Sequence, residues 1–201
     1  MYALEGIEML DKRLTLALNS LHCGWSDQIW TILSSRAIWI PDYLLVAAGF
    51  IRHFGWKRAL LFIGGAGLLV LFSDQFCNLV KDTFCRIRPC NDAWMIDHGL
   101  NCLSRPTRSF GFFSAHAANS FGLATYAVKG INTGIYGKRN KTGTIASALI
   151  FLWATAVSAS RIFVGRHFLG DIIVGLLFGI LAGYVIALAV AFVNRRIKAK
   201  G

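Results

Sequence analysis

Long apolar runs bounded by charged residues are the feature that most limits what this chain can fold into. A bilayer core needs about 20 predominantly apolar residues for each helix that spans it. Apolar runs occur at residues 38–52, 58–80, 113–130, 144–164 and 170–194. They predict an all-α fold, namely a polytopic membrane helix bundle with about five spanning helices.

Composition supports a membrane protein. Of the 201 residues, 55% are hydrophobic and only 15% are charged, whereas soluble domains carry about 25% charged residues. No linker, repeat or low-complexity tract divides the chain, so we expect a single membrane domain over 1–201.

The first 37 residues have a different character from the rest. They mix apolar and charged residues and are too polar to span a membrane, so residues 1–37 predict interfacial amphipathic helices before a spanning bundle over 38–201. Trp25, Trp30 and Trp39 are expected at the level of the lipid headgroups. Acidic residues among the first 40 argue against a signal peptide.

The net charge of +11 is distributed unevenly over the predicted loops. Residues 52–58, 129–142 and 194–201 share one side of a five-helix bundle and hold 11 Lys/Arg with no acid, which predicts that this side is cytoplasmic. Segments 81–112 and 160–171 then face the opposite side. Because the basic residues are scattered through an apolar chain, we expect no nucleic-acid partner.

Three stretches on this non-cytoplasmic face carry chemically useful side chains. They are KDTFCRIRP from Lys81, FSAH at 113–116, and SRIFVGRHFLGD at 160–171. Lysine and arginine bind phosphate oxygens, and crowded cations repel one another unless an anion joins them. The clustering therefore predicts a phosphate site.

The third stretch places His167 four residues before Asp171, on one face of a helix. A carboxylate that holds one ring nitrogen leaves the other free to attack phosphorus. His116 lies at a predicted helix N-terminus, where anions are favoured, and could protonate a leaving oxygen. Taken alone, each motif has a plainer explanation, such as a metal pair, a helical hydrogen bond or cations anchoring a helix end.

Together these residues resemble the three-part signature of the type 2 phosphatidic acid phosphatase (PAP2) family of integral membrane lipid phosphatases, with its PAP2/haloperoxidase-like core. The matching parts are Lys81 to Arg88-Pro89, Phe113 to His116, and Ser160-Arg161 through His167 to Asp171. The resemblance implies that His167 forms a phosphohistidine, that Asp171 is its partner and that His116 is the general acid. It further implies phosphate contacts from Lys81, Arg88, Ser114, Ala115 and Arg161, with no metal ion and no cofactor.

The second motif departs from the family pattern Pro-Ser-Gly-His, because Phe113 and Ala115 replace the proline and the glycine. Four further arginines match no invariant position and are interpreted either as contacts to a larger anionic headgroup or as surface charge: Arg86, Arg105, Arg108 and Arg166. Cys90 and Cys102 flank one short loop and are either disulfide-bonded or free thiols.

The implied substrate is a lipid phosphate or diphosphate. FSAHAANSFGLA is similar to lipid A phosphatases of Gram-negative bacteria, so lipid A and undecaprenyl diphosphate are the leading candidates, with the active site at the periplasmic face of the bacterial cytoplasmic (inner) membrane. Phosphatidylglycerophosphate, phosphatidic acid, phosphoryl transfer to another lipid, and an inactive lipid-phosphate-binding or transport protein stay as alternatives. Soluble vanadate haloperoxidases share the signature but lack the apolar runs. The sequence leaves the oligomeric state open.

Overall fold

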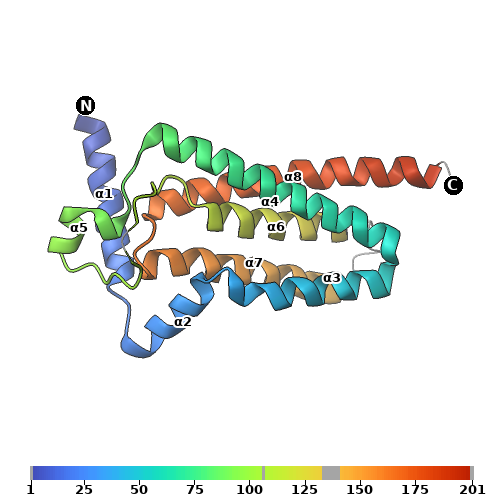
Figure 1. Ribbon diagram of the computed structural model, residues 1–201, viewed down its shortest axis with the longest axis horizontal. Coiled ribbons are helices and arrows are strands. Elements are labelled where there is room, and N and C mark those ends of the chain that lie inside the picture. The colour runs from blue at the N-terminus through green and yellow to red at the C-terminus, as the bar shows by residue number, and fades with distance from the viewer. Residues whose placement is uncertain (1, 106, 133–140, 200–201) are drawn as a thin grey trace.

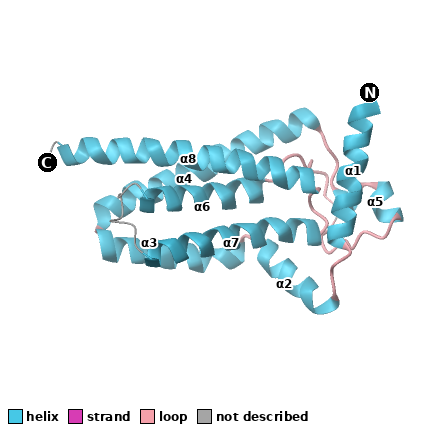
Figure 2. Cartoon of the chain, turned by 180° about the vertical axis from the view of Figure 1, so that it is seen from behind, coloured by secondary structure: helices cyan, strands magenta, loops and turns pink. Residues whose placement is uncertain are grey.

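The computed structural model describes residues 2–105, 107–132 and 141–199, and within these ranges it consists of helices joined by loops, with no strand (Figures 1 and 2). Eight α-helices and two short 3-10 helices follow one another in the described chain: α1 (Tyr2–Asn19), α2 (Gly24–Ser34), η1 (Ala37–Trp39), α3 (Ile40–Phe54), α4 (Trp56–Phe84), η2 (Pro89–Asn91), α5 (Ala93–Asp97), α6 (Ala115–Asn132), α7 (Lys141–Phe163) and α8 (Leu169–Ala199).

Helices α3, α4, α6, α7 and α8 run along the long axis of the molecule (Figure 1). α6 packs on α8, α7 and α4, while α3 packs on α4. Three helical stretches are long and apolar enough to cross a membrane: Trp56–Asp97, Thr144–Phe163 and Leu169–Ile197. α3 has 15 residues and α6 has 18, fewer than the about 20 that a straight crossing needs. The all-α membrane bundle is therefore confirmed, and the count of five spans stays a prediction.

Glycines on one face of α8 allow it to lie very close to α6. Gly175, Gly179 and Gly183 recur every fourth residue, and an added Cβ at Gly175 would be 2.6 Å from the carbonyl oxygen of Ser114. At Gly179 and Gly183 a Cβ would overlap the α6 backbone at residues 118 and 122. Small residues at this spacing let membrane helices approach backbone to backbone, and here they align the N-terminal ends of α6 and α8.

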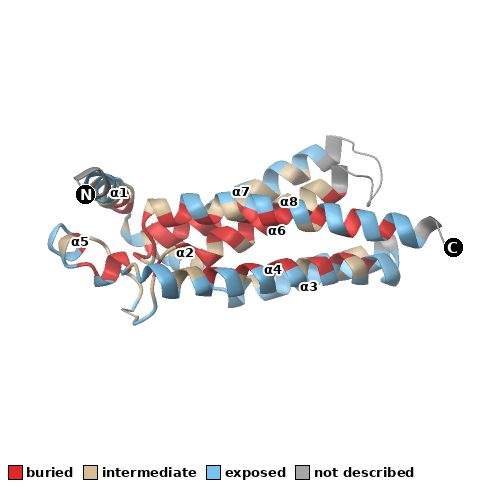
Figure 3. Cartoon of the chain, turned by 90° about the horizontal axis from the view of Figure 1, so that it is seen from above, coloured by how far each residue is buried: buried red, intermediate tan, exposed pale blue. Residues whose placement is uncertain are grey.

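The distribution of apolar side chains fits a lipid environment. Residues buried between the long helices form a continuous line through the bundle, while the outward faces of α4, α7 and α8 remain exposed (Figure 3). Large aliphatic side chains dominate those outward faces; Leu71, Leu152 and Leu177 are each at least 60% exposed. A soluble protein would leave a large apolar surface of this kind in water, whereas lipid chains cover it in a membrane.

Helices α1, α2 and α5 gather at one end of the bundle, and α1 lies across its long axis (Figure 1). Helices are therefore present in residues 1–37 as expected, and their position at the membrane interface stays a prediction. Trp30 stacks on Phe163 of α7 with ring centroids 4.2 Å apart, and Trp39 meets Trp153 edge-on at 5.6 Å. Two of the three tryptophans assigned to the headgroup level therefore pack against α7, while Trp25 is 73% exposed.

The α3–α4 junction and the C-terminal end of α8 lie at the opposite end of the molecule (Figure 1). Basic residues described at that end include Lys57, Arg58, Arg195 and Arg196. Of the basic loop expected at 129–142, residues 133–140 lie outside the described part of the chain.

Candidate active site

A cavity of about 530 Å³ opens at the end of the bundle where α1, α2 and α5 gather. All three sequence motifs contribute to it. Six of the eight predicted site residues line its wall: Lys81, Arg88, Ala115, His116, Arg161 and His167. Residues separated by up to 86 positions in the sequence therefore face one space.

Most of these side chains lie in the first or last turn of a helix. Lys81 is in the last turn of α4, which is followed by Cys85 in a left-handed conformation with φ of 48°. His116 is the second residue of α6, and Arg161 is in the last turn of α7. His167 occupies the loop between α7 and α8. The site thus forms where three of the long helices begin or end.

His167 and Asp171 form the expected pair, but the prediction that both lie on one helix was wrong, because α8 begins at Leu169 and leaves His167 in the preceding loop. Nδ1 of His167 lies 3.3 Å from Oδ2 of Asp171, and the same oxygen accepts a hydrogen bond of 3.1 Å from the backbone N–H of Phe168. Both side chains are buried, Asp171 completely. Burial lowers the pKa of His167 to about 4, although the hydrogen bond and charge of Asp171 oppose this. The imidazole is therefore neutral near pH 7.

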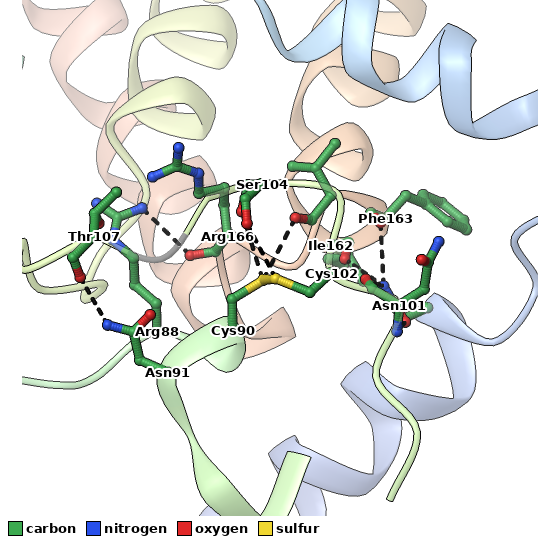
Figure 4. The surroundings of a disulfide bond; sticks show 12 residues. Arg88, Cys90, Asn91, Asn101, Cys102, Ser104, Thr107, Ile162, Phe163 and Arg166 are labelled. Carbon is green, nitrogen blue, oxygen red and sulfur yellow. Dashed lines mark hydrogen bonds between the residues drawn. A yellow bond between two sulfur atoms is a disulfide. The ribbon is translucent and has the colours of Figure 1, made fainter. Parts of the chain in front are cut away.

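The loop after α4 is tied directly to the loop that holds His167. The backbone N–H of Cys90 donates to the carbonyl of Gly165 over 3.2 Å. Nη1 of Arg88 lies 3.4 Å from the carbonyl oxygen of Arg166 (Figure 4). Gly165 has a φ of 73°, and a Cβ there would overlap the sulfur of Cys90. The first and third motifs therefore hold each other in place through backbone contacts.

Cys90 and Cys102 are joined in a disulfide bond, with their Cα atoms 5.7 Å apart (Figure 4). This decides between the two interpretations of these cysteines in favour of the pair. The backbone N–H of Ser104, just beyond the bridge, donates to the carbonyl of Val164 over 3.2 Å. The bridged loop thus forms one wall of the site.

Two of the phosphate-binding candidates, Arg88 and Arg161, are held in place by hydrogen bonds to serines. Arg88 is 9% exposed and donates from Nε to the carbonyl of Ser109 over 2.9 Å and from Nη2 to the Ser109 hydroxyl over 3.1 Å. Nη1 of Arg161 donates to the hydroxyl and, over 3.1 Å, to the carbonyl of Ser34. Ser34 belongs to α2, so an N-terminal helix orients an arginine of the third motif.

The second motif supplies one unpaired donor or acceptor and one buried hydroxyl. Nε2 of His116 is buried without a hydrogen-bond partner among the described residues, and the side chain lines the cavity. Ser114 is fully buried and is not part of the cavity wall. Its hydroxyl faces the backbone N–H of Ala117 over 3.4 Å at the start of α6. A direct Ser114 contact to phosphate stays a prediction.

The four arginines that match no family position differ in whether they line the cavity. Arg105 and Arg166 line the cavity, whereas Arg108 is exposed and is not part of its wall. Arg86 points elsewhere and bridges two carboxylates, Asp171 and Asp11. Neither the headgroup contact nor the surface charge expected for Arg86 describes it, because sequence alone did not show that Asp11 of α1 would lie beside it.

Cations greatly outnumber acids around the cavity. Six arginine and lysine side chains and no carboxylate are among the described residues of its wall. Arg36, which follows α2, is one of the six and lines the same cavity as Lys81, His116 and Arg161. No group of three His, Cys, Asp or Glu side chains in the described ranges is arranged to hold a metal ion. The cavity is suited to an anion.

Sequence reasoning missed the contribution of the N-terminal helices. The missed residues are Asp11, Thr15 and Asn19 on α1, and Ser34 and Arg36 at and after the end of α2. A signal for the first three was present, because they recur every fourth residue and form a polar stripe on an otherwise amphipathic helix. Nothing in the sequence singles out Ser34 or Arg36.

Comparison with known proteins gives matches over most of the chain. The family described as the PAP2 superfamily matches residues 59–195. A protein named Lipid A 4'-phosphatase from Bacteroides thetaiotaomicron is 31% identical over 184 residues, which cover 90% of this chain and 77% of that protein. Another Lipid A 4'-phosphatase, from Porphyromonas gingivalis, is 27% identical over 188 residues, covering 91% and 74%.

Two solved structures share the fold. The crystal structure of a transmembrane PAP2-type phosphatidylglycerolphosphate phosphatase from Bacillus subtilis aligns with a TM-score of 0.68 at 19% identity, covering 90% of this chain and 84% of that one. The crystal structure of LpxE from Aquifex aeolicus aligns with a TM-score of 0.59 at 24% identity, covering 88% and 93%. At these identities the likeness concerns the arrangement of helices.

Proposed function

Because this chain belongs to the PAP2 superfamily, we propose that it removes a phosphate group from a lipid A-type glycolipid through a phosphohistidine. The observation that carries the proposal is the cavity itself, where two histidines from separate segments face one space lined with cations. The choice of lipid A rests on the two relatives named Lipid A 4'-phosphatase, whose matches cover about nine-tenths of this chain.

In the first step, Nε2 of His167 attacks phosphorus. Asp171 accepts the hydrogen bond from Nδ1–H, which leaves the lone pair on Nε2 available and stabilises the positive charge that develops on the ring. The low pKa of His167 keeps the ring unprotonated before attack. The nitrogen–phosphorus bond forms as the bond from phosphorus to the lipid oxygen breaks.

His116 donates a proton to the leaving group. Its buried Nε2 has no protein partner among the described residues, so this nitrogen is available to carry a proton to the departing lipid oxygen. In the second step the neutral His116 takes a proton from water, and the resulting hydroxide equivalent attacks the phosphohistidine. Inorganic phosphate leaves, and His167 and His116 return to their starting states.

Lys81, Arg88 and Arg161 neutralise the phosphoryl oxygens in both steps. Charge increases on these oxygens in the transition state, and donors held in place before reaction stabilise it without further reorganisation. Arg88 and Arg161 fit this role because Ser109 and Ser34 already hold their guanidinium groups. The backbone N–H groups near Ala115, at the start of α6, are aligned to help.

Three additional cations favour a headgroup with more than one anionic group. Arg36, Arg105 and Arg166 line the cavity beyond the residues that the signature uses. A single phosphate carries at most two negative charges, so the remaining positive charge is best balanced by a second acidic group on the same lipid. This supports a glycolipid phosphate over a small monoanionic phosphate ester.

A purified-lipid panel tests the function. Wild-type protein in detergent should release inorganic phosphate from lipid A faster than from undecaprenyl diphosphate, phosphatidylglycerophosphate or phosphatidic acid, and the His167→Ala variant should release none from any of them. Mass spectrometry of the lipid products separates hydrolysis from transfer to another lipid. Preference for undecaprenyl diphosphate, or transfer without free phosphate, would overturn the proposed reaction.

We also propose that the cavity faces the periplasm. The opposite end of the bundle carries Lys57, Arg58, Arg195 and Arg196, as cytoplasmic loops do, and the Cys90–Cys102 disulfide suits an oxidising compartment. Cys85 is exposed at the cavity end, whereas Cys77 is buried. A thiol reagent that cannot cross membranes should therefore label Cys85 in intact spheroplasts.

The matched control places a thiol at the other end. In a Cys23→Ser/Cys85→Ser background, an Arg196→Cys variant should react only after the membrane is permeabilised. Labelling of that variant in intact spheroplasts, with Cys85 of the wild type protected, would reverse the orientation and restrict the enzyme to inner-leaflet substrates.

A further inference from the structure

Helix α1 is attached to the catalytic end of the bundle by a stripe of three polar residues. Asp11 Oδ1 accepts a hydrogen bond of 2.8 Å from the N–H of Gly170, and Thr15 Oγ1 accepts one of 2.9 Å from the N–H of Leu169. Asn19 donates to the carbonyl of Ile162 over 3.0 Å. The first N–H groups of a helix have no partner within it, so α1 caps the N-terminus of α8 from outside.

A chain of alternating charges extends from α1 to the proposed nucleophile. Arg86 donates from Nη2 to Oδ2 of Asp11 and from Nη1 to Oδ1 of Asp171, both over 2.7 Å. The other oxygen of Asp171 faces Nδ1 of His167. The guanidinium of Arg86 also lies over the ring of Phe168, 4.3 Å from its centroid. Four side chains from three segments thus form one continuous connection.

Burial explains why this connection matters. Asp171 is fully buried, and a buried carboxylate without a partner is strongly disfavoured. Arg86 supplies the opposite charge, and Asp11 fixes the orientation of Arg86 by occupying its second nitrogen. A Cβ at Gly170 would lie 2.8 Å from Oδ2 of Asp11, so the helix start has little room for Asp11 to move.

We propose that Asp11 and Arg86 are positioning residues that hold the carboxylate of Asp171 in a fixed orientation, and thereby keep Nε2 of His167 directed at the phosphoryl group. The proposal rests on the proposed phosphohistidine function and extends it to α1. In this arrangement one residue of α1, Asp11, helps to position the nucleophile. Asp11 acts through Arg86 and Asp171 and touches neither substrate nor nucleophile.

The Asp11→Asn variant tests the first link. Asparagine keeps an oxygen for the N–H of Gly170 but removes the charge that holds Arg86. Groups that orient the ligands of a catalytic metal typically contribute about 10- to 100-fold to activity, and we expect a group that orients a nucleophile through its carboxylate to contribute a similar amount. We expect kcat for lipid phosphate hydrolysis to fall in that range with KM changed by less than about twofold, because ground-state binding is untouched. Asp11→Glu should recover part of the loss.

Lys12→Gln is the matched control on the same helix. Lys12 pairs with Asp92 over 2.9 Å and with Glu8 over 3.1 Å, so this change also removes an ion pair between α1 and the catalytic end but leaves Asp171 alone. Its kcat should stay near that of the wild type. An equal loss in Lys12→Gln and Asp11→Asn would show that docking of α1 alone matters and would overturn the positioning role.

A double-mutant cycle with Asp171→Asn tests whether the residues act as one unit. Once Asp171 is neutral, replacing Asp11 by asparagine or Arg86 by glutamine should lower kcat no further. Full additivity of the losses would contradict the connection. Thermal unfolding in detergent accompanies each kcat measurement, so that only folded protein is compared.

Nitrogen-15 NMR of the His167 ring gives a readout that needs no substrate. Wild-type protein should hold the neutral tautomer with the proton on Nδ1, and Asp11→Asn should show a mixture of tautomers. If the wild type releases no phosphate from any lipid but the tautomer still depends on Asp11, the positioning role stands and the proposed function fails. If phosphate release and tautomer are both unchanged in Asp11→Asn, the function stands and the positioning role fails.

Discussion

The two parts of this molecule are held together by different forces. Along the membrane-embedded length of the bundle, close backbone approach and stacked aromatic rings join the helices: Gly179 lies against Ala118, and Phe76 stacks on Phe178 with centroids 4.8 Å apart. At the catalytic end, ion pairs, side-chain hydrogen bonds and a disulfide do so.

This difference follows from the surroundings of each part. Within lipid, apolar side chains gain nothing by leaving hydrocarbon, so close packing and lipid release must stabilise helix contacts. At the end of the bundle, functional cations and carboxylates have to be buried in defined positions, and directional interactions achieve that. The embedded part should therefore tolerate changes on its lipid-facing side, whereas the catalytic end should tolerate few.

The largest effect is expected from His167→Ala. Loss of the nucleophile should reduce phosphate release by at least about 10³-fold, because the remaining groups cannot form the covalent intermediate. The embedded part does not depend on this side chain, so detergent gel filtration should show an unchanged, folded protein. Retention of substantial turnover would assign the nucleophile elsewhere.

His116→Ala should rank next, with a loss of about 10²- to 10⁴-fold on lipid substrates. The loss should shrink on an aryl phosphate such as p-nitrophenyl phosphate, because its leaving oxygen needs no proton. An equal loss on both substrates would argue against a proton donor and for a purely structural role.

Gly179→Leu should destabilise the packing of α6 on α8 in the membrane-embedded part. The larger side chain would overlap the carbonyl of Ala118, and overpacking of this kind costs about 1–3 kcal/mol. The thermal unfolding midpoint in detergent should fall, and activity should fall with it, since α6 and α8 align His116 with the His167–Asp171 pair.

Gly67→Leu is the control for that change, because a Cβ at Gly67 of α4 meets no atom within 4 Å. Its midpoint and activity should both match those of the wild type. A similar fall in the two variants would mean that leucine is harmful at any glycine of the bundle.

Reduction of the Cys90–Cys102 bridge should have an effect that is confined to the catalytic end. Closing a loop of this size stabilises a fold by about 3 kcal/mol, so dithiothreitol should lower the unfolding midpoint of the wild type. The Cys90→Ser/Cys102→Ser variant should already be at the lower value and should not respond. Cys85→Ser, which removes an exposed free thiol, should behave like the wild type.

The smallest effect is expected from Arg105→Gln. Arg105 is an exposed member of the cavity wall, and an exposed ion pair contributes about 0.2–1 kcal/mol. KM for a lipid with two phosphates should rise about two- to fivefold with kcat unchanged. The rise should vanish at high salt and on a lipid with one phosphate. A fall in kcat would place Arg105 nearer the reaction than we propose.

Much of the fold was predictable from local properties. The apolar runs predicted the long helices within a few residues, as in α8, expected at 170–194 and found at Leu169–Ala199. The pairing of His167 with Asp171 was also predictable, because the two residues are only four positions apart and their contact depends on local geometry.

The surroundings of the site were not predictable in the same way. Arg86 was interpreted without its two carboxylates, one of which lies 75 residues away in sequence. Cys90 and Cys102 could equally have remained free thiols, and Ser34, which holds Arg161, gave no signal. The contact of Arg86 with Asp11 and that of Arg161 with Ser34 depend on how α1 and α2 dock against the bundle, and the disulfide depends on how the 90–102 loop folds.

Hydropathy and motif chemistry alone predict a helical membrane protein that resembles the PAP2 family, with two histidines and a set of cations on one face. Both are properties of short segments, so they can be read without coordinates. The three-dimensional arrangement of the helices was needed to show which cations face the cavity, which one pairs with carboxylates, and that α1 caps the helix carrying Asp171. Those outcomes depend on distances of a few ångströms between segments far apart in the chain, because charge pairing and hydrogen bonding act only over such distances.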